Sequence, residues 1–269
     1  MSLKIYTGLR EFYSKYDYFL IDLWGVVHNG HNLLPGVDMC ISNLKAHKKN
    51  ILFLTNSPRP GYVLEAHLKE LGLPLDGPRV YSSGDSCLQA LKENWAHKSC
   101  YFLGDPVFHE SIVKAIPGPV VTSIEKADYV LMTGIPGTTA YVIEESLKLG
   151  LPLICANPDK SAIHGTTQVM CPGTVADDYE KQGGKVYYFG KPYPSIYEQA
   201  LKNLGPPPKD KVLAIGDGLF TDILGATGVG IDCVFIQAGL YHSLSLESIE
   251  KICKDNQMMP TYGLERLNW

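Results

Sequence analysis

Residues 18–30 read YFLIDLWGVVHNG, and this stretch decides the predicted fold. It begins with four bulky apolar residues, Tyr18 to Ile21, which have the length and character of a strand buried on both faces of a parallel sheet. The strand ends in Asp22, at the edge where open α/β sheets bind their ligands. Gly25 follows and permits a tight turn that exposes the carboxylate. Asp22 is therefore a candidate nucleophile, although most aspartates at strand ends only cap a turn.

The composition is that of a folded protein with a sizeable core. The chain has 269 residues, of which 45% are hydrophobic and 19% are charged. This length exceeds one typical domain, and we favour two domains over one large one. The formal net charge is -4. Without a long basic run, the sequence lacks the electrostatic pattern of a protein that binds nucleic acid or an anionic membrane.

The N-terminal segment MSLKIYTGLREF contains charged residues and no apolar core, so we expect neither a signal peptide nor a membrane anchor. No stretch of about 20 uninterrupted apolar residues follows. These features predict a cytoplasmic protein without membrane partners. The seven cysteines include no C-x-x-C pair and are predicted to be reduced thiols in the core. The sequence leaves a homo-oligomer open.

Strand and helix patterns alternate along the chain in three groups. Such alternation predicts an α/β fold with a parallel sheet, right-handed crossovers and helices on both faces. The second group, from about residue 100 to 185, is predicted to be an inserted α/β unit. The expected strands are 18–21, 51–54, 79–83, 100–103, 129–133, 152–156, 186–189, 212–215 and 233–236. The expected helices are 35–50, 60–71, 85–94, 107–115, 139–149, 195–204 and 222–227.

Two further strand ends carry groups suited to phosphate. Thr55, Asn56 and Ser57 follow the strand 51–54 and offer hydroxyl and backbone N–H donors to phosphate oxygens. Lys191 follows the strand 186–189, where its ammonium can neutralise two anions brought close together. Each signal is weak alone, because most loop lysines are simply solvated.

The strand 212–215 ends in the most informative group of acidic residues. Asp217 and Asp222 follow it within the segment GDGLFTD. Carboxylates beside a turn suit a hard divalent cation, which commonly takes one or two protein carboxylates together with substrate phosphate. The alternative is that Asp217 opens a turn and Asp222 caps the next helix, which is more credible for Asp222.

In their order and spacing, these four segments resemble the motifs of the haloacid dehalogenase superfamily, in its class IIA branch of p-nitrophenylphosphatase-like (NagD-like) hydrolases. The segments LLPGVDMCISNLK, ADYVLMTG and CANPD are also similar to class IIA phosphatases, so the resemblance covers nearly the whole chain. The motif residues are Asp22-Leu23-Trp24-Gly25-Val26, Leu54-Thr55-Asn56-Ser57, Gly190-Lys191-Pro192, and Gly216-Asp217 with Asp222.

The resemblance implies a Rossmann-like core formed by residues 1–97 and 186–269, and an inserted α/β cap formed by residues 98–185. It also implies a small phosphorylated substrate, which Asp22 would attack to give an aspartyl-phosphate that water hydrolyses. Thr55 and Lys191 would hold phosphoryl oxygens. The expected substrate contacts are Thr55, Asn56, Ser57, Lys191 and, in the cap, Asn157.

The implied cofactor is Mg²⁺, which would offset the charge between nucleophile and phosphate. Its ligands would be a carboxylate oxygen of Asp22, the backbone carbonyl of Trp24 and the carboxylate of Asp217. Asp222 would support this set of ligands.

The sequence departs from the family pattern at Trp24, where family phosphatases usually have an aspartate that protonates the leaving oxygen. Indole cannot transfer protons at neutral pH. His28 is the nearest candidate for a replacement acid. Three hypotheses follow: a Mg²⁺-dependent phosphatase that is slow on poor leaving groups, a dehalogenase-like hydrolase, and a catalytically silent protein that binds a phosphorylated ligand. Asp217 and Asp222 argue against the dehalogenase, because that chemistry needs no metal.

Overall fold

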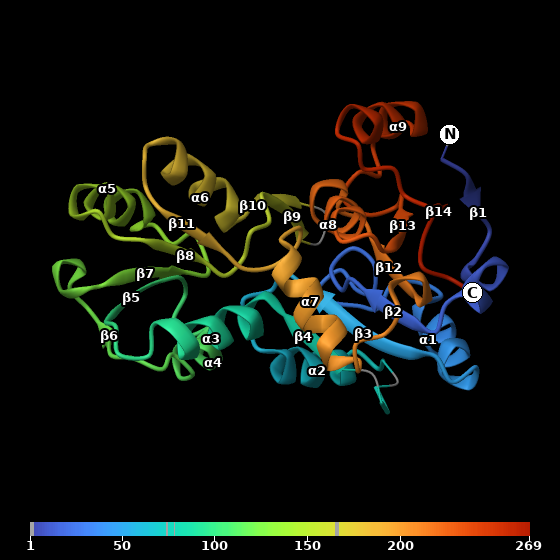
Figure 1. Ribbon diagram of the computed structural model, residues 1–269, viewed down its shortest axis with the longest axis horizontal. Helices are drawn as coiled ribbons and strands as arrows, with labels where there is room; N and C mark the ends of the chain where they lie inside the picture. The colour runs from blue at the N-terminus through green and yellow to red at the C-terminus, as the bar shows by residue number, and fades with distance from the viewer. Residues whose placement is uncertain (1–2, 74, 78, 165–166) are drawn as a thin grey trace.

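The larger of two parallel sheets has seven strands in the order β1-β14-β13-β12-β2-β3-β4 (Figure 1). The structure is a computed structural model, and it describes residues 3–73, 75–77, 79–164 and 167–269. The strands are β1 (Ile5–Tyr6), β2 (Tyr18–Ile21), β3 (Asn50–Thr55), β4 (Arg79–Ser82), β12 (Val212–Gly216), β13 (Asp232–Ile236) and β14 (Tyr262–Leu264). The predicted α/β class with a parallel-sheet core is confirmed.

The strand β2 lies near the middle of this sheet, between β12 and β3. Its residues Phe19, Leu20 and Ile21 are buried, as expected for a strand that helices cover on both faces. Ile21 is paired in register with Ile215 on one side and with Phe53 on the other. The residues that follow these three strands therefore emerge together at the carboxyl edge of the sheet.

Helices bury both faces of the larger sheet. On one face pack α1 (Val37–Ala46) and α2 (Gly61–Glu70), and on the other pack α7 (Pro194–Asn203), α8 (Leu224–Gly228) and α9 (Leu246–Asp255). In α1 the buried residues are Val37, Cys40, Ile41 and Leu44, which recur at helical spacing and form the inward face. The prediction extended this helix to residues 35–50, beyond its observed ends at both termini.

The smaller sheet has five parallel strands in the order β11-β8-β7-β5-β6. The strands are β5 (Cys100–Leu103), β6 (Val120–Val121), β7 (Tyr129–Met132), β8 (Leu153–Cys155) and β11 (Val186–Tyr188). The helices α3 (Ser83–Asn94) and α4 (Glu110–Val113) pack on one face, and α5 (Thr139–Leu149) and α6 (Pro172–Lys181) pack on the other. All seven cysteines are free and buried, as predicted.

The structure assigns two elements differently from the prediction. The predicted insert began at residue 98, but Cys87, Leu88 and Leu91 of α3 pack in the core of the smaller sheet. The predicted insert ended at residue 185, but β11 pairs with β8 of the smaller sheet. Both elements read locally as ordinary helix and strand, and only long-range packing decides which sheet they join. The group built on the smaller sheet therefore begins near residue 83 and ends near residue 189.

An antiparallel hairpin of β9 (Ser161–His164) and β10 (Thr167–Met170) was not predicted. The residues of β10 are exposed, and its sequence, TQVM, carries little apolar signal. In Figure 1 the hairpin lies between the smaller sheet and the part of the molecule that contains α8. It therefore borders the space between the two sheets.

The elements built on the larger sheet form one group, and those built on the smaller sheet form the other. The chain passes from the larger group to the smaller one at residues 82–83 and returns at residues 189–190. Ser83 lies at the first crossing, and its Oγ shares one proton between the carbonyl oxygens of Ala156, at 2.6 Å, and Phe189. The two crossings are therefore held together.

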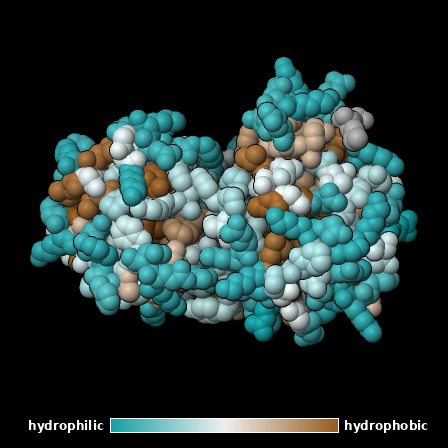
Figure 2. All heavy atoms as spheres, in the orientation of Figure 1, coloured by the Kyte–Doolittle hydropathy of each residue, from teal (hydrophilic) through white to brown (hydrophobic). Residues whose placement is uncertain are grey.

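The face of the molecule in Figure 2 is mostly hydrophilic, with separate hydrophobic patches on both halves. No helix in the described part of the chain combines the length and the apolar character needed to cross a bilayer.

Candidate active site

Four polar segments converge at the carboxyl edge of the larger sheet. Asp22 follows β2, Thr55 ends β3 and Asp217 follows β12, and the backbone N–H of Asp22 donates to the carbonyl oxygen of Ile215 at 2.8 Å. Lys191 follows β11 in the chain and reaches into the same site. The parallel strands β2, β3 and β12 bring Asp22, Thr55 and Asp217 together in space, although Asp22 and Asp217 are 195 residues apart along the sequence.

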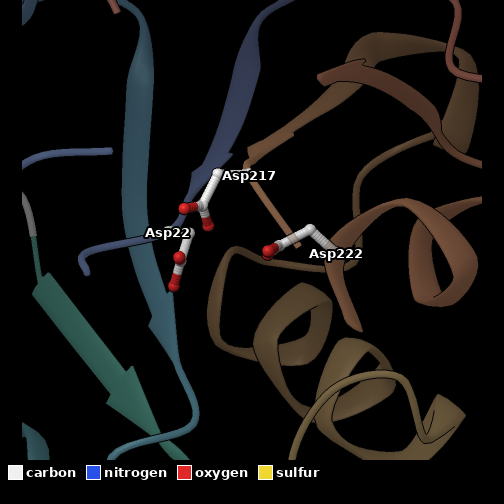
Figure 3. A group of neighbouring side chains, drawn as sticks. All are labelled: Asp22, Asp217 and Asp222. Atoms are coloured by element: carbon white, nitrogen blue, oxygen red, sulfur yellow. The ribbon is translucent and has the colours of Figure 1, made fainter. Parts of the chain in front are cut away.

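Three aspartates form the centre of the site (Figure 3). One carboxylate oxygen from each of Asp22, Asp217 and Asp222 lies within 4.8 Å of the other two, and all three residues are buried. Asp222 comes from a wide helical turn, Leu219–Ile223, that directly precedes α8. Its Oδ2 accepts a hydrogen bond of 3.0 Å from the backbone N–H of Gly218, which fixes the side chain.

Burial and mutual repulsion make the aspartate cluster electrostatically strained. Burial raises the pKa of Asp217 to about 7, with a further contribution from the charge of Asp222. Burial also raises the pKa of Asp22 well above its usual range, and Asp222 and Asp217 raise it further against the opposing effect of Lys191. A divalent cation would relieve this repulsion. The buried oxygen donors therefore fit a hard cation such as Mg²⁺.

The ammonium of Lys191 is buried and fully hydrogen-bonded. Its Nζ donates to Asp22 Oδ1 at 2.6 Å, to Asp222 Oδ1 at 2.7 Å and to the carbonyl oxygen of Leu54 at 2.9 Å. Burial disfavours its charge, but the attraction of Asp22 and Asp222 outweighs burial and raises the pKa of Lys191. Lys191 therefore stays charged and orients the candidate nucleophile.

Asn56 connects the two groups of elements through its side-chain amide. Its Nδ2 donates to Asp159 Oδ1 at 2.8 Å and to the carbonyl oxygen of Lys191 at 2.9 Å. Its Oδ1 accepts a hydrogen bond of 2.6 Å from the backbone N–H of Lys191. These bonds position Lys191 and Asp159, and the role of Asn56 in substrate binding, which is expected from the sequence, stays a prediction because this residue also lines the cavity described below.

The remaining residues of the second motif lie in the same loop. Thr55 is buried, and its Oγ1 accepts a hydrogen bond of 3.3 Å from the backbone N–H of Ser57. Ser57 Oγ in turn accepts one of 3.3 Å from the backbone N–H of Arg59. Both hydroxyls therefore stabilise the turn and also line the cavity described next.

A cavity of about 340 Å³ lies above the aspartates, between the two groups of elements. The predicted residue Asn157 lines it, and its Oδ1 accepts a hydrogen bond of 3.1 Å from the backbone N–H of Asp159. Other lining residues were not predicted from the sequence, because arginine and histidine in loops have no periodic signal. The lining includes Asp22, Trp24, Thr55, Arg59 and Lys191 from the larger group, and Phe108, His109, Thr133 and Asp159 from the smaller one.

Trp24 also lines the cavity, with its indole packed against the following loop. A Cβ atom on Gly30 would lie 2.6 Å from Cη2 of Trp24, so the ring fits only because residue 30 is glycine. The Trp24 ring contacts the His28 ring edge to face, with centroids 5.2 Å apart. An indole thus occupies the space beside the candidate nucleophile.

His28 is buried and neutral near pH 7. Burial lowers the pKa of His28 to about 4, and the nearby His67 and Arg59 lower it further. Its Nδ1 accepts a hydrogen bond of 2.9 Å from the backbone N–H of Gly30, so the ring proton is on Nε2. A neutral imidazole is a weak acid, which argues against His28 as the replacement proton donor. Asp159 is the alternative carboxyl group in the cavity, and burial raises its pKa to about 6.

Comparison with known proteins agrees with this combination of fold and strand-end aspartates. Residues 19–115 match the family described as haloacid dehalogenase-like hydrolase, and residues 188–262 match a second family described as HAD-hydrolase-like. The two matched segments together cover most of the chain, and they identify it as a hydrolase of the haloacid dehalogenase superfamily.

Particular relatives cover almost the entire chain. It is 27% identical over 262 residues to an acid sugar phosphatase from Staphylococcus aureus, covering 95% of this chain and 96% of that protein. A hydrolase of the haloacid dehalogenase-like family from Brucella suis superposes with a TM-score of 0.86 at 28% identity, covering 98% and 100% of the two chains. The glycerol phosphate phosphatase from Mycobacterium tuberculosis, solved in complex with magnesium, shares the fold at a TM-score of 0.73 and 22% identity, covering 93% and 75%.

Proposed function

We propose that this protein is a Mg²⁺-dependent phosphatase that hydrolyses a small phosphate monoester through an aspartyl-phosphate on Asp22. The observation that carries the proposal is the buried cluster of Asp22, Asp217 and Asp222 with Lys191 bonded to the nucleophile. Similarity to an acid sugar phosphatase and to a magnesium-bound glycerol phosphate phosphatase supports it.

In the first step, a carboxylate oxygen of Asp22 attacks the phosphorus atom. A new O–P bond forms, and the bond from phosphorus to the leaving oxygen breaks with its electron pair on that oxygen. Lys191 holds Asp22 Oδ1 at 2.6 Å, and no further hydrogen bond to the Asp22 carboxylate occurs among the described residues. Oδ2 of Asp22 is therefore the oxygen that attacks.

In the second step, water attacks the phosphorus of the acyl phosphate. Inorganic phosphate leaves, the Asp22 carboxylate is restored, and the proton of the water passes to solvent or to a nearby base. The Thr55 hydroxyl lines the cavity and would donate to a phosphoryl oxygen, while the Lys191 ammonium, whose three N–H groups are bonded to Asp22, Asp222 and Leu54, supplies positive charge. Because Lys191 also contacts Asp222, it keeps its position after the Asp22 oxygen has reacted.

The carboxylates of Asp22 and Asp217 and the backbone carbonyl of Trp24 would hold Mg²⁺, with Asp222 in support. When bound, the ion supplies positive charge that offsets the repulsion between carboxylate and phosphate. The backbone N–H of Leu240 donates to Asp217 Oδ2 at 2.7 Å and so orients this carboxylate.

Trp24 limits the proposed reaction to substrates whose leaving oxygen needs little protonation. The same residue favours a second candidate function, a silent protein that binds phosphorylated ligands. Phosphate release from p-nitrophenyl phosphate, alkyl phosphates and a haloacid, each with and without Mg²⁺, separates the candidates. Mg²⁺-dependent release from the aryl ester that Asp22→Asn abolishes supports the phosphatase. Ligand binding without any release indicates the silent protein, and halide release without Mg²⁺ indicates a dehalogenase.

A further inference from the structure

Arg59 presents to the cavity a guanidinium that forms no hydrogen bond or ion pair with the described residues. It lies in the loop after the second motif and lines the same cavity as Asp22. Its Nε is buried and forms no hydrogen bond, and no ion pair or hydrogen bond to the guanidinium occurs among the described residues. Buried charges in proteins are normally paired. The partner of this cation is therefore missing from the protein itself.

The only marked contact of the Arg59 guanidinium within the described part of the chain is with an aromatic ring. Its Cζ lies 4.8 Å from the ring centroid of Phe108, which belongs to the smaller group of elements. A ring face stabilises a cation but leaves all five N–H donors of arginine available. Arginine with free N–H donors in a fixed plane is suited to a carboxylate or a phosphate.

No carboxylate in the described cavity lining pairs with Arg59, and that of Asp217 accepts a hydrogen bond from the backbone N–H of Leu240. His28 and His109 both line the cavity and are neutral, because burial lowers the pKa of each to about 4. The carboxylates of Asp22 and Asp222 are bonded to Lys191, and that of Asp159 is bonded to Asn56. A ligand is thus the remaining source of negative charge for Arg59.

We propose that Arg59 binds a second anionic group of the substrate, so that the preferred substrates are phosphate monoesters that also carry a carboxylate or a second phosphate. This inference rests on the proposed phosphatase function, with the reacting phosphoryl group at Asp22. Because Phe108 comes from the smaller group, substrate binding at Arg59 also depends on how the two groups close over the cavity.

Matched aryl phosphates test the proposal without changing the reaction. The probes are 4-carboxyphenyl phosphate, its neutral counterpart 4-carbamoylphenyl phosphate, and benzene-1,4-diyl bisphosphate. We expect wild-type kcat/KM to favour the carboxylate over the amide by about 10- to 100-fold, mainly through KM, as for hydrogen bonds to charged groups. The bisphosphate shows which of the two anionic groups Arg59 prefers. Equal kcat/KM for all three compounds overturns the proposal.

Substitutions test whether the preference for the carboxylate compound over the amide depends on Arg59. Arg59→Gln is expected to remove the preference for the carboxylate, and Arg59→Lys to retain part of it, because the charge remains while the planar pair of donors is lost. Arg10→Gln, at an exposed arginine that does not line the cavity, is the matched control and should keep the preference. A preference that Arg59→Gln leaves intact also overturns the proposal.

Failure of the proposed function gives a different result. In that case p-nitrophenyl phosphate is not hydrolysed at all, and calorimetric affinities of wild type and Arg59→Gln for the same three compounds decide the role of Arg59. Tighter binding of the anionic compounds to wild type alone supports it, and equal affinities overturn it.

Discussion

Gly25 packs directly against the carboxylate of Asp217. A Cβ atom on Gly25 would overlap Asp217 Oδ2 and lie 3.0 Å from Cγ, and the glycine φ of +82° is one that other residues rarely adopt. The turn after the nucleophile therefore determines where the second acidic group lies.

From this contact we predict that Gly25→Ala lowers kcat/KM for p-nitrophenyl phosphate by about 100-fold, the effect of a misplacement near 1 Å in an active site. Steady-state kinetics measure it. Gly228→Ala is the matched control, because a Cβ there meets nothing within 4 Å and its φ is not positive. Similar losses in the two variants would contradict a specific role for Gly25.

Removing the charge of Asp217 should weaken Mg²⁺ binding. Asp217→Asn keeps the size of the side chain but replaces an anionic ligand with a neutral amide, so we expect a sharply lower affinity by titration calorimetry. Asp178→Asn is the control, since Asp178 is exposed and its only ion pair among the described residues is with Lys181. Equal affinities of Asp217→Asn and wild type would exclude this metal site.

Replacing the candidate nucleophile should stop turnover without unfolding the protein. Asp22→Asn removes one of three mutually repelling carboxylates, while Lys191 keeps its bonds to Asp222 and Leu54. We expect no aspartyl-phosphate and turnover at background. Near-ultraviolet circular dichroism and a cooperative unfolding transition check the fold. Turnover near that of wild type would show that the nucleophile lies elsewhere.

The indole at position 24 should make the rate depend steeply on the leaving group. Aryl phosphates should react measurably and alkyl phosphates hardly at all, because no positioned acid protonates the leaving oxygen. Trp24→Asp should raise alkyl-phosphate turnover by up to about 10² to 10⁴. The gain will be reduced by the space that the indole leaves, which costs at most about 3 to 5 kcal/mol at a fully buried site.

The ratio of aryl to alkyl turnover in the wild-type protein is the decisive measurement for Trp24. Similar rates would refute the prediction and would show that another group donates the proton. The candidate for that group is Asp159, whose carboxyl group lines the cavity. Asp159→Asn would then lose the alkyl activity selectively.

The contribution of His28 to stability should fall in mildly acid solution, because this histidine is buried. The pKa of His28 is about 4 in the folded protein, against 6.5 for an exposed side chain. Between these values only the unfolded chain takes up the proton at this side chain, so the contribution of His28 to the free energy of unfolding falls as pH decreases from 6.5 to 4. The upper limit of this loss is about 3 kcal/mol.

Urea denaturation at pH 7 and pH 4.5 measures the loss at His28. His28→Gln should show a smaller decrease than wild type, and His97→Gln, at an exposed histidine, should match wild type. Equal decreases in His28→Gln and wild type would contradict the assignment of the effect to His28.

Sequence reasoning located the strand ends well, because the rule that governs them is local. A buried apolar run followed by Asp22, Thr55 or Asp217 predicts both the strand and the edge at which the side chain emerges. Membership of a sheet is not local, so β11 was expected in the wrong sheet, and the polar strand β10 was missed. Arg59 gave no signal, since its significance depends on Phe108, which only the folded chain brings near.

The hydrogen bonds of Ser83 bear on how the two halves of the molecule can move relative to each other. Both connections between the two sheets pass through one place, where Ser83 Oγ meets the carbonyl oxygens of Ala156 and Phe189. We expect these bonds to limit relative motion of the two halves to rotation about this place, with little sliding. The cavity volume of about 340 Å³ belongs to the one relative orientation of the two halves that this structure has. The largest substrate admitted is then set by the range of this rotation, and substitutions at Ser83 would alter release of product without touching a reacting atom.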